Sequence, residues 1–428
     1  MGNKQSFLNQ RFITEPERKI LLAGCCDVLV AGGGPAGFAA AVSAARRGAK
    51  TFLLEKNEYL GGIWTAGLMP WIIDFQNKTG IMAELCEKLK SVGGYAARTN
   101  TFTAPPEEIK FLLEKIAAEA GVTILYGTSV CNAVTNDRRI DYIITESRSG
   151  REAWQAKIFI DATGDGNLSA AAGCEFAYGN QEKMAQPASL TALLGGVDPE
   201  QSKEFFVTSL YGKDRFLEVL QTAGITPSYT KPSLFHFGCG IVGLMSHHAY
   251  NVNPFDSKSV SQAVITGRAE IYRQIELLKK IPGWENTVLL ATAANLGIRE
   301  ARRVKGKAAV TINELNMKSY PEQTVCIPKF CIDIHAPDPR KCTSVISSRP
   351  AVTQSGYGIP FKALQSFDID NLLLAGRCIS GDFFMHASYR VTGNAVPMGE
   401  AAGWGAAEAI RQGIELEDLN NVPCFSEI

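Results

Sequence analysis

Residues 27–55 read DVLVAGGGPAGFAAAVSAARRGAKTFLLE, and this stretch decides the fold. An apolar run over 28–30 leads directly into a Gly-x-Gly-x-x-Gly turn at 32–37. A helical pattern of small residues follows, and a second apolar run ends at the acid Glu55. Strand, glycine turn, helix and acid-terminated strand, in this order, are the parts of a βαβ unit that binds an adenine dinucleotide.

Each glycine of the turn has its own physical task. Gly32 permits a tight strand-to-helix turn, Gly34 lets the backbone approach a pyrophosphate, and Gly37 lets the helix pack close to the sheet. The helix N-terminus offers free N–H groups and a partial positive charge to the phosphates. A carboxylate at Glu55 accepts hydrogen bonds from ribose hydroxyls and disfavours a 2′-phosphate. We therefore expect NAD or FAD rather than NADP, and the turn alone leaves the choice between them open.

The composition is that of a soluble globular protein. The 428 residues predict two or three domains, and 46% hydrophobic with 20% charged residues predict a sizeable core. The formal net charge is zero, which gives no electrostatic reason to expect nucleic acid or an anionic membrane as a partner. The sequence contains no run of about 20 apolar residues, so it predicts no transmembrane helix.

The cysteine pattern favours free thiols in a reducing cytoplasm. Eleven cysteines are scattered along the chain without a CxxC pair, and no histidine cluster has zinc-ligand spacing, so no metal is expected. Residues 1–6 match a myristoylation pattern and residues 22–25 a lipoprotein cleavage box. We interpret both as accidental, since charged residues stand where an apolar signal segment would precede the box.

Local patterns predict the order of elements and a discontinuous domain. The patterns predict helices over 79–92, 106–120, 258–281 and 393–412, and strands over 122–126, 129–134, 140–147, 154–160 and 371–375. We expect a first domain from 24–175 plus 350–415, an inserted domain over 176–349, and an N-terminal lead-in over 1–23. A second Gly-x-Gly-x-x-Gly at 238–243 lacks a following helix and acid, and is interpreted as an ordinary turn.

Three separated elements agree with one family. They are GGGPAG at 32–37 with Glu55, DATGDG at 161–166, and NLLLAGRCIS at 371–380 followed by HASYRVTGNAVPMGEAAG. The chain resembles the FAD-dependent oxidoreductases of the glutathione-reductase/succinate-dehydrogenase-like superfamily. It is most similar to a bacterial family with LGG-x-x-TAG after the ribose acid and IDIH before the last strand, and the resemblance covers about 25–412. The implied fold is α/β, a Rossmann-like FAD-binding domain with an inserted α+β substrate domain.

The resemblance implies FAD, bound in an extended form. The residues implied to hold the pyrophosphate and ribose are Gly32, Gly34, Pro35, Ala36, Gly37, Glu55 and Lys56, with Gly62 and Thr65 in the following loop. Val130 is implied beside the adenine, and the adenosine half passes Ala162, Thr163 and Gly164. The diphosphate and ribityl chain are implied beside Gly376 and Arg377, and the flavin C2 carbonyl beside Gly393, Asn394 and Ala395. Small residues in this last helix suit close contact with a ring system or with another helix.

Four side chains are candidates for the chemistry. Arg299 and Arg302 share one face if their segment is helical and can then clamp a carboxylate; a salt-bridged helix with Glu300 is the alternative. His335 closes a strand-like run and can exchange a proton, or serve as a hydrogen-bonded loop residue. Arg390 stands before the final helix, where it can contact substrate or flavin.

The expected function is that of an FAD-dependent oxidoreductase that transfers a hydride between a small organic substrate and flavin N5. A second half-reaction then needs an electron acceptor or donor that the sequence does not identify. Two alternatives stay open: an NAD(P)H-dependent flavoprotein reductase, and a non-catalytic flavin-binding protein. The sequence leaves the substrate and the oligomeric state open.

Overall fold

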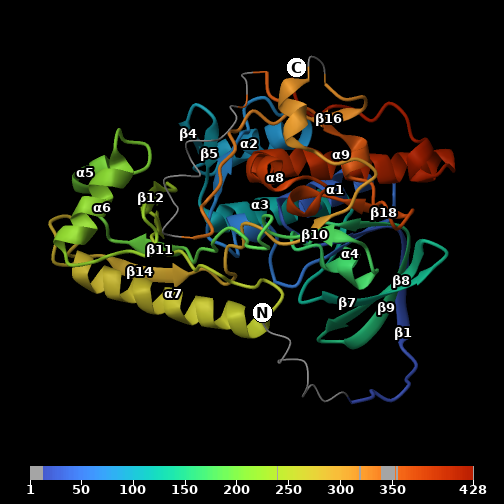
Figure 1. Ribbon diagram of the computed structural model, residues 1–428, viewed down its shortest axis with the longest axis horizontal. Helices are drawn as coiled ribbons and strands as arrows, with labels where there is room; N and C mark the ends of the chain where they lie inside the picture. Colours follow the sequence, from blue (N-terminus) through green and yellow to red (C-terminus); the bar gives the residue numbers. More distant parts are fainter. Residues whose placement is uncertain (1–12, 239, 318–319, 339–351, 353–354, 428) are drawn as a thin grey trace.

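The structure is a computed structural model that describes residues 13–238, 240–317, 320–338, 352 and 355–427. The chain builds two adjoining parts, visible in Figure 1 as a larger part that contains the first and last elements and a smaller part around the long helix α7. The predicted boundary at 349/350 and the myristoylation pattern at 1–6 lie outside the described residues.

The larger part is organised around a seven-stranded sheet. Its order is β6-β2-β1-β9-β8-β7, with β18 also paired to β9. The strands span Leu21–Ala31 (β1), Thr51–Leu54 (β2), Thr123–Leu125 (β6), Ser129–Asn136 (β7), Arg139–Ser147 (β8), Gly150–Asp161 (β9) and Leu372–Leu374 (β18). Strands β6, β2, β1, β9 and β18 run parallel, whereas β7 and β8 are antiparallel additions.

Strand β9 joins sequence-distant parts of this sheet. Its first residues, 150–154, pair with β8, and its last, 159–161, pair with β18 in parallel. The other edge pairs with β1 along nearly the whole strand. The carboxyl ends of β1, β9 and β18 therefore meet at one edge of the sheet, which is where open parallel sheets bind ligands.

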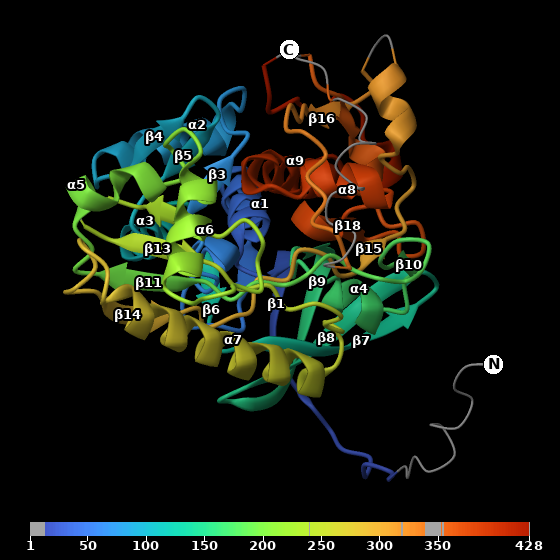
Figure 2. The same cartoon turned by 60° about the vertical axis from the view of Figure 1, so that its left-hand side comes forward.

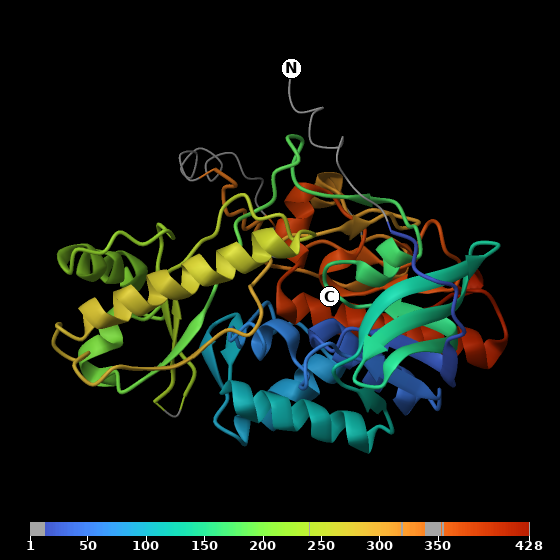
Figure 3. The same cartoon turned by 90° about the horizontal axis from the view of Figure 1, so that it is seen from below.

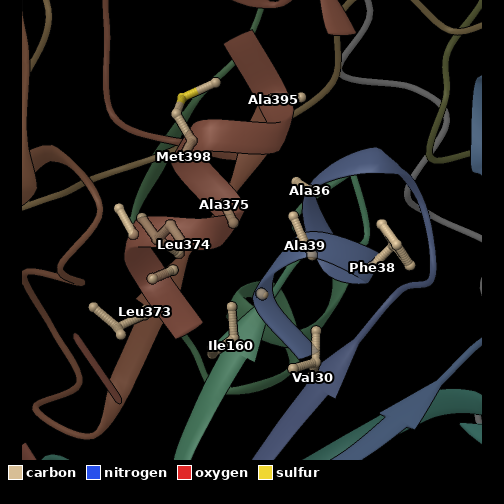
Figure 4. Packing of buried hydrophobic residues seen from close by; sticks show 14 of the residues in the cluster. Val30, Ala36, Phe38, Ala39, Ile160, Leu373, Leu374, Ala375, Ala395 and Met398 are labelled. Atoms are coloured by element: carbon tan, nitrogen blue, oxygen red, sulfur yellow. The ribbon is translucent and has the colours of Figure 1, made fainter. Parts of the chain in front are cut away.

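Two helices cross the sheet in close contact, α1 (Pro35–Arg46) and α9 (Thr392–Gln412). Figure 4 shows apolar side chains of both helices gathered with those of the strand ends. A Cβ added at Gly399 would lie 2.0 Å from the backbone oxygen of Ala36, and one at Gly403 would lie 2.0 Å from that of Ala40. These two glycines serve contact between helices, so the ring-system interpretation does not apply to them.

The smaller part has a sheet and core of its own. The sheet order is β12-β13-β11-β14, all antiparallel, with strands Ala192–Gly195 (β11), Ser233–His236 (β12), Val242–Met245 (β13) and Val288–Thr292 (β14). Helices α6 (Gly212–Thr222) and α7 (Ser257–Leu278) accompany it, and Figure 3 shows α7 extending along this part. Its apolar core consists of Leu68 and residues between 188 and 296.

The remaining described elements complete the frame. Helices α2 (Gly80–Lys90) and α3 (Pro106–Glu119) pack beside α9 and α1, and the sheet β3-β5-β4 consists of Trp71–Ile73, Thr101–Thr103 and Tyr95–Arg98. Figure 2 shows α2 and α3 on the same side of α1 as β4 and β5. The shorter elements are α4 (Asn167–Ala171), β10 (Phe176–Ala177), α5 (Pro199–Ser202), β15 (Arg303–Val304), β16 (Thr324–Cys326), β17 (Ile359–Pro360) and α8 (Phe383–Tyr389).

The fold class predicted from the sequence is confirmed. The predicted helices correspond to α2, α3, α7 and α9, within a few residues at each end. Strand β1 begins at Leu21, where it pairs with β9, so the structure has a strand in the last three residues of the expected lead-in over 1–23. Within the described residues, no helix is both long and apolar enough to cross a bilayer. The division into domains at the expected boundaries stays a prediction.

Candidate functional site

A cavity of about 440 Å³ opens at the carboxyl edge of the parallel strands and extends to the smaller part. Most of the predicted cofactor residues line it: Gly32, Gly34, Pro35, Ala36, Glu55, Lys56, Gly62, Ala162, Thr163, Gly164, Gly376, Arg377 and Ala395. Three of the four catalytic candidates line the same cavity, namely Arg299, His335 and Arg390. Motifs separated by more than 300 residues thus contribute to one site.

Six predicted residues do not line the cavity, and most have structural contacts instead. Gly37 is required by packing, since its Cβ would lie 1.7 Å from the backbone oxygen of Gly32. Thr65 donates its hydroxyl hydrogen bond to the backbone oxygen of Leu60 at 2.6 Å. A Cβ at Gly393 would lie 2.2 Å from the backbone oxygen of Ile73. Also outside the lining are Val130, Asn394 and Arg302.

Arg302 lies apart from Arg299 because their segment is not helical. Residues 298–302 form an irregular stretch before β15, and the helical premise of a shared face is wrong. The Arg302 guanidinium stacks over Phe255, with its carbon 4.0 Å from the ring centroid, and donates to the backbone oxygen of Asp165 at 3.0 Å. Arg302 is therefore a packing residue, and it gives no support to a two-arginine clamp.

The glycine turn leaves open space where a phosphate would approach. Gly32 has a φ of +99°, a conformation that favours glycine, and a Cβ there would collide with the backbone of Ala162 at 2.5 Å. Gly34 is different, because its nearest neighbour to an added Cβ is the Cα of Gly62 at 3.9 Å. The protein itself therefore does not require glycine at position 34, and the Cβ would only fill the cavity.

Glu55 is held rigidly at the end of β2. It is 5% exposed, and its carboxylate accepts hydrogen bonds from the backbone N–H of Gly33 at 2.6 Å and from the backbone N–H of Asn57 at 2.8 Å. The Asn57 side chain also donates to it, and Asn57 in turn accepts from Asn295 of the smaller part at 3.3 Å. Both parts of the molecule thus contribute to this end of the cavity.

The N-terminus of α9 faces the cavity without a side-chain cap. Val391, Thr392 and Ala395 line the cavity, and the first helical turn contains no acidic residue. The buried hydroxyl of Thr392 has no hydrogen-bond partner among the described residues. A helix N-terminus carries a partial positive charge, so this end of α9 suits an electron-rich group of a ligand.

Arg377 lines the cavity and contacts several segments around it. It donates from Nε to the backbone oxygen of Gly164 at 2.9 Å, and it also contacts the Asp165 carboxylate and the backbone oxygen of Ile298. Since Ile298 packs against the core of the smaller part, this one side chain links three segments that surround the site. Its ion pair with Asp165 leaves little uncompensated charge at this position.

Asp333 and His335 form a pair in the cavity wall. His335 Nε2 lies 3.1 Å from the Asp333 carboxylate, and both residues line the cavity. The strand expected to end at His335 is absent, because residues 327–336 are irregular. Burial, and then the charge of Arg299, lower the pKa of His335 to about 4. Although burial opposes it, the His335 hydrogen bond and nearby arginines hold the pKa of Asp333 below its usual range.

The imidazole of His335 is fixed by neighbouring rings. The ring centroid of Tyr229 lies 5.9 Å from that of His335, and the ring of His248 lies 5.3 Å away, edge to face. Tyr229 and His248 stack on each other at 3.8 Å. Burial lowers the pKa of His248 well below its ordinary value, so the group next to His335 is an uncharged imidazole at neutral pH.

Three cationic side chains share this end of the cavity: Lys213, Arg299 and Arg390. Arg299 Nη1 donates to the backbone oxygen of Pro187 at 2.6 Å, and Arg390 Nη2 to that of Asp333 at 3.0 Å. Burial lowers the pKa of all three groups, that of Arg299 to about 10. Within the described residues, no group of histidine, cysteine or acidic side chains has the arrangement of a metal site.

Sequence reasoning missed several residues of this site. Lys213 is the second residue of α6, and Tyr229 precedes β12; neither stands in a recognisable motif. Asp333 could have been predicted from the sequence, because IDIH places an acid two residues before His335. The apolar wall was also missed, and its members are Met69, Trp71, Phe235 and Met245.

Comparison with known proteins identifies the family. The family model described as FAD dependent oxidoreductase matches residues 27–427. The chain belongs to this family. FAD is therefore its cofactor, as the three separated sequence motifs implied.

The curated relatives of this FAD dependent oxidoreductase include archaeal thiamine thiazole synthases. The enzyme from Methanococcus vannielii is 34% identical over 148 residues, which is 32% of this chain and 56% of that protein. The enzyme from Methanococcus maripaludis strain C5 is 32% identical over the same shares of both chains. The chain thus spans little more than half the length of these relatives, and their activity is not carried over.

Solved structures resemble this oxidoreductase at low identity. A geranylgeranyl bacteriochlorophyll reductase-like protein from Thermoplasma acidophilum matches 91% of this chain and 80% of its own, at 16% identity and a TM-score of 0.48. A p-nitrophenol 4-monooxygenase from Pseudomonas putida matches 92% and 82%, at 11% identity and a TM-score of 0.49. Likeness at this level says nothing about the substrate.

The cavity of this oxidoreductase fits FAD on observations of its own residues. The open space beside Gly34 suits a pyrophosphate, and the buried carboxylate of Glu55 suits a ribose. At the other end of the cavity, the uncapped N-terminus of α9 and the partnerless hydroxyl of Thr392 suit the polar edge of a flavin. The donor set therefore matches an extended dinucleotide between these two ends.

Proposed function

We propose that this FAD dependent oxidoreductase transfers a hydride between a small organic substrate and N5 of the flavin. One observation carries the proposal: a single cavity contains the dinucleotide turn, the N-terminus of α9 and the Asp333–His335 pair. We assign FAD binding to residues 24–175 with 350–415, and the substrate-facing residues mainly to 176–349.

The cofactor, when bound, supplies the two-electron chemistry, and the protein supplies position, charge and protection from water. In this proposal Gly32, Gly34 and the N-terminus of α1 bind the pyrophosphate, and Glu55 orients the ribose. The partial positive charge of α9 favours negative charge at the flavin edge. Arg377, tied to Gly164 and Asp165, keeps the two parts of the site in register.

His335 is the proposed proton-transferring group. Because its pKa lies near 4, the imidazole is neutral at physiological pH. The ionised Asp333 accepts a hydrogen bond from Nε2–H, which leaves Nδ1 as the nitrogen that can accept a proton from substrate. Stacked Tyr229 and His248 restrict the ring, so Asp333 and these rings are positioning residues.

The cofactor assignment can be tested on purified protein by its absorption spectrum before and after acid release of the cofactor. We expect bound flavin, released as FAD. Glu55→Ala should lower FAD affinity by about tenfold or more, because it removes a charged hydrogen-bond acceptor at the ribose. Glu58→Ala is the matched control, since Glu58 is exposed and its ion pair in the described part of the chain is with the exposed Arg148. Unchanged FAD affinity in Glu55→Ala would contradict the assigned ribose position.

The redox assignment requires a second measurement. The FAD-bound protein is mixed anaerobically with a panel of small organic substrates, and separately with NADH and NADPH. We expect at least one of the organic substrates to bleach the flavin. Bleaching by pyridine nucleotide alone would favour a flavoprotein reductase. Bleaching by chemical reductant but by no substrate or nucleotide would favour a non-catalytic flavin-binding protein.

A further inference from the structure

The substrate end of the cavity has an excess of positive charge. Lys213, Arg299 and Arg390 line it, whereas Asp333 is the carboxylate that shares this end. No ion pair joins Lys213 or Arg299 to an acidic side chain among the described residues. Asp333 is 3.7 Å from Arg390 and also accepts from His335, so its charge is already shared between two groups.

Protein contacts occupy only part of each guanidinium. Arg299 uses Nη1 for the backbone oxygen of Pro187 and the hydroxyl of Ser189, and its Nη2 contacts only the sulfur of Met245, at 3.7 Å. Arg390 uses Nη2, while its buried Nε has no partner within the part of the chain that the structure describes. Each arginine therefore retains N–H groups that a planar anion can engage in a fork geometry.

Lys213 brings a third cation from the smaller part of the molecule. It stands in the first turn of α6, and among the residues that the structure describes no hydrogen bond or ion pair holds its ammonium group. Burial lowers its pKa; the charge of Asp333 opposes this shift, and the charges of Arg98, Lys231 and Arg299 add to it. A half-buried ammonium that lines the same cavity as two guanidinium groups is costly unless an anion joins them, because like charges repel strongly away from water.

An apolar wall adjoins these cations. Met69, Trp71, Phe235 and Met245 line the cavity and belong to one apolar cluster. The rings of Trp71 and Phe235 pack edge to face at 4.9 Å, and Met245 contacts Arg299 directly. A ligand at this position therefore meets positive charge at one end and aromatic surface at the other.

We infer that the substrate is a small organic carboxylate with an apolar body. Arg299, Arg390 and Lys213 bind the carboxylate, and the wall formed by Trp71, Phe235 and Met245 receives the body. His335 then stands beside the bound molecule, at the junction of the two. The inference rests on the proposed function, since it names the substrate class of that site, and it makes Lys213 a specificity-determining residue.

Titration of the FAD-bound protein with matched acids and amides tests the inference. The probes are benzoate, phenylacetate and 3-phenylpropanoate, each with its primary amide, followed by flavin difference spectra and by calorimetry. We expect at least one acid to bind about tenfold or more tightly than its amide, as a charged hydrogen bond provides. Lys213→Met should remove most of that difference while leaving amide binding and FAD content unchanged.

Two control variants keep the result interpretable. Lys231→Met removes a neighbouring, exposed lysine that pairs with Asp214, and Arg302→Met removes an arginine outside the cavity; both should bind the acids as the unchanged protein does. Arg299→Lys retains the charge but loses the fork, and should weaken acid binding without affecting amides.

The outcomes separate this inference from the proposed function. A series in which no acid binds more tightly than its own amide overturns the carboxylate assignment, while the flavin spectrum and substrate bleaching still report on the proposed function. Equal loss of acid binding in Lys213→Met and Lys231→Met overturns the role of Lys213. Failure of the purified protein to bind FAD overturns the proposed function and is detected before any acid is added.

Discussion

Gly34 and Gly37 stand one helical turn apart, yet glycine is needed at each for a different reason. At Gly37 a methyl group would collide with the backbone oxygen of Gly32 at 1.7 Å. At Gly34 it would meet no protein atom closer than 3.9 Å and would project into the cavity. Packing of the chain therefore explains Gly37, whereas the bound cofactor explains Gly34.

Substitution of these two glycines should separate stability from cofactor binding. Gly34→Ala should leave the unfolding free energy of the cofactor-free protein within about 0.5 kcal/mol and lower FAD affinity by about tenfold or more. Gly37→Ala should cost about 1–3 kcal/mol of stability or more, because the backbone must shift. Denaturant unfolding and FAD titration of both variants measure the two quantities. A Gly34→Ala protein with unchanged FAD affinity would contradict the phosphate site.

The acidity of His335 gives a pH prediction for the reaction. With a pKa near 4, this imidazole is neutral above about pH 5 and charges as the pH falls through 4. A neutral base is required, so kcat/KM should be independent of His335 ionisation at neutral pH and should fall in acid. His335→Gln should lower kcat by about 10²–10⁴ with FAD content unchanged.

His236→Gln provides the control for this variant. His236 ends β12, lies outside the cavity lining and contacts Tyr95, so its loss should leave kcat within about twofold. A pH profile with stopped-flow bleaching of the flavin measures the effect. Equal kcat in the His335→Gln and unchanged proteins would exclude His335 as the proton-transferring group.

Residues of the site differed in how far local sequence revealed them. The glycine turn and Glu55 were predictable because their roles depend on neighbours within a single βαβ unit. Phe235 reaches the cavity through the assembly of the four-stranded sheet β12-β13-β11-β14, and Lys213 through the placement of α6. No local sequence pattern encodes either arrangement. Arg302 was misplaced because in a non-helical segment residues three apart do not share a face.

At the scale of elements, a side chain of α9 completes the start of α2. The buried carboxylate of Glu400 accepts a hydrogen bond from the backbone N–H of Ile81 at 2.8 Å, beside Gly80. Helix N-termini leave such N–H groups without partners inside the helix. Glu400 thus joins two helices that are distant in sequence, and burial raises its pKa to about 7.

This contact predicts a pH dependence of stability. The folded pKa of about 7 lies above the ordinary value of 4.5, so the folded state retains the proton more strongly than the unfolded state. The contribution of protonated Glu400 to the unfolding free energy is complete below about pH 4.5 and is lost as the pH rises through about 7. Glu400→Gln keeps a hydrogen-bond acceptor and removes the titrating group. Between pH 5 and 8 the unfolding free energy of the unchanged protein should therefore fall by about 2–3 kcal/mol more than that of the variant. Parallel pH curves for both proteins would contradict this.

Element prediction succeeded where periodicity was strong and failed where tertiary contacts decide. The amphipathic pattern of α7 and the small-residue pattern of α9 each extend over many turns and were recognised. The segment 327–336 resembles a strand by composition, but it has no strand partner and its backbone instead contacts Asp74 and α8. Hydrogen-bond partners, rather than composition, determine whether such a run becomes a strand.

At the scale of the whole molecule, the cavity joins two separately packed cores. Residues of the large core carry Glu55 and α9, and residues of the smaller core carry Arg299 and Lys213. Asn57 with Asn295, and Arg377 with Ile298, are direct contacts between the parts at the cavity. A ligand that bridges this cavity must therefore stabilise both parts together.

Cofactor binding should accordingly raise the stability of the entire chain. At free FAD a hundredfold above its dissociation constant, the unfolding free energy should rise by about 2.7 kcal/mol, as mass action requires. Thermal unfolding should remain a single transition that shifts upward for probes in both parts. Riboflavin, which lacks the pyrophosphate and adenosine, should give a much smaller shift at the same concentration. Stabilisation confined to one part would show that the cofactor does not bridge the two.

The sequence predicts a discontinuous first domain because NLLLA at 371–375 resumes a buried-strand pattern after a long region of different composition. The sequence did not predict how the region before this strand packs. Val310, Val325 and Ile332 belong to the large core although they precede the strand. An apolar residue does not indicate by its type which of two cores it will join, so the sequence pattern alone does not locate the boundary between the two parts.

The pairing of β18 with β9, and of α9 with α1, also has a consequence for synthesis on the ribosome. When the first 300 residues have emerged, the carboxyl half of β9 has no neighbour on the side that β18 later takes, and the face of α1 that receives α9 is bare. The nascent chain must then keep apolar surface from aggregating until residues 372–412 arrive. Chaperone demand during translation should therefore be high, and C-terminal truncation within α9 should yield insoluble protein rather than a weakened enzyme.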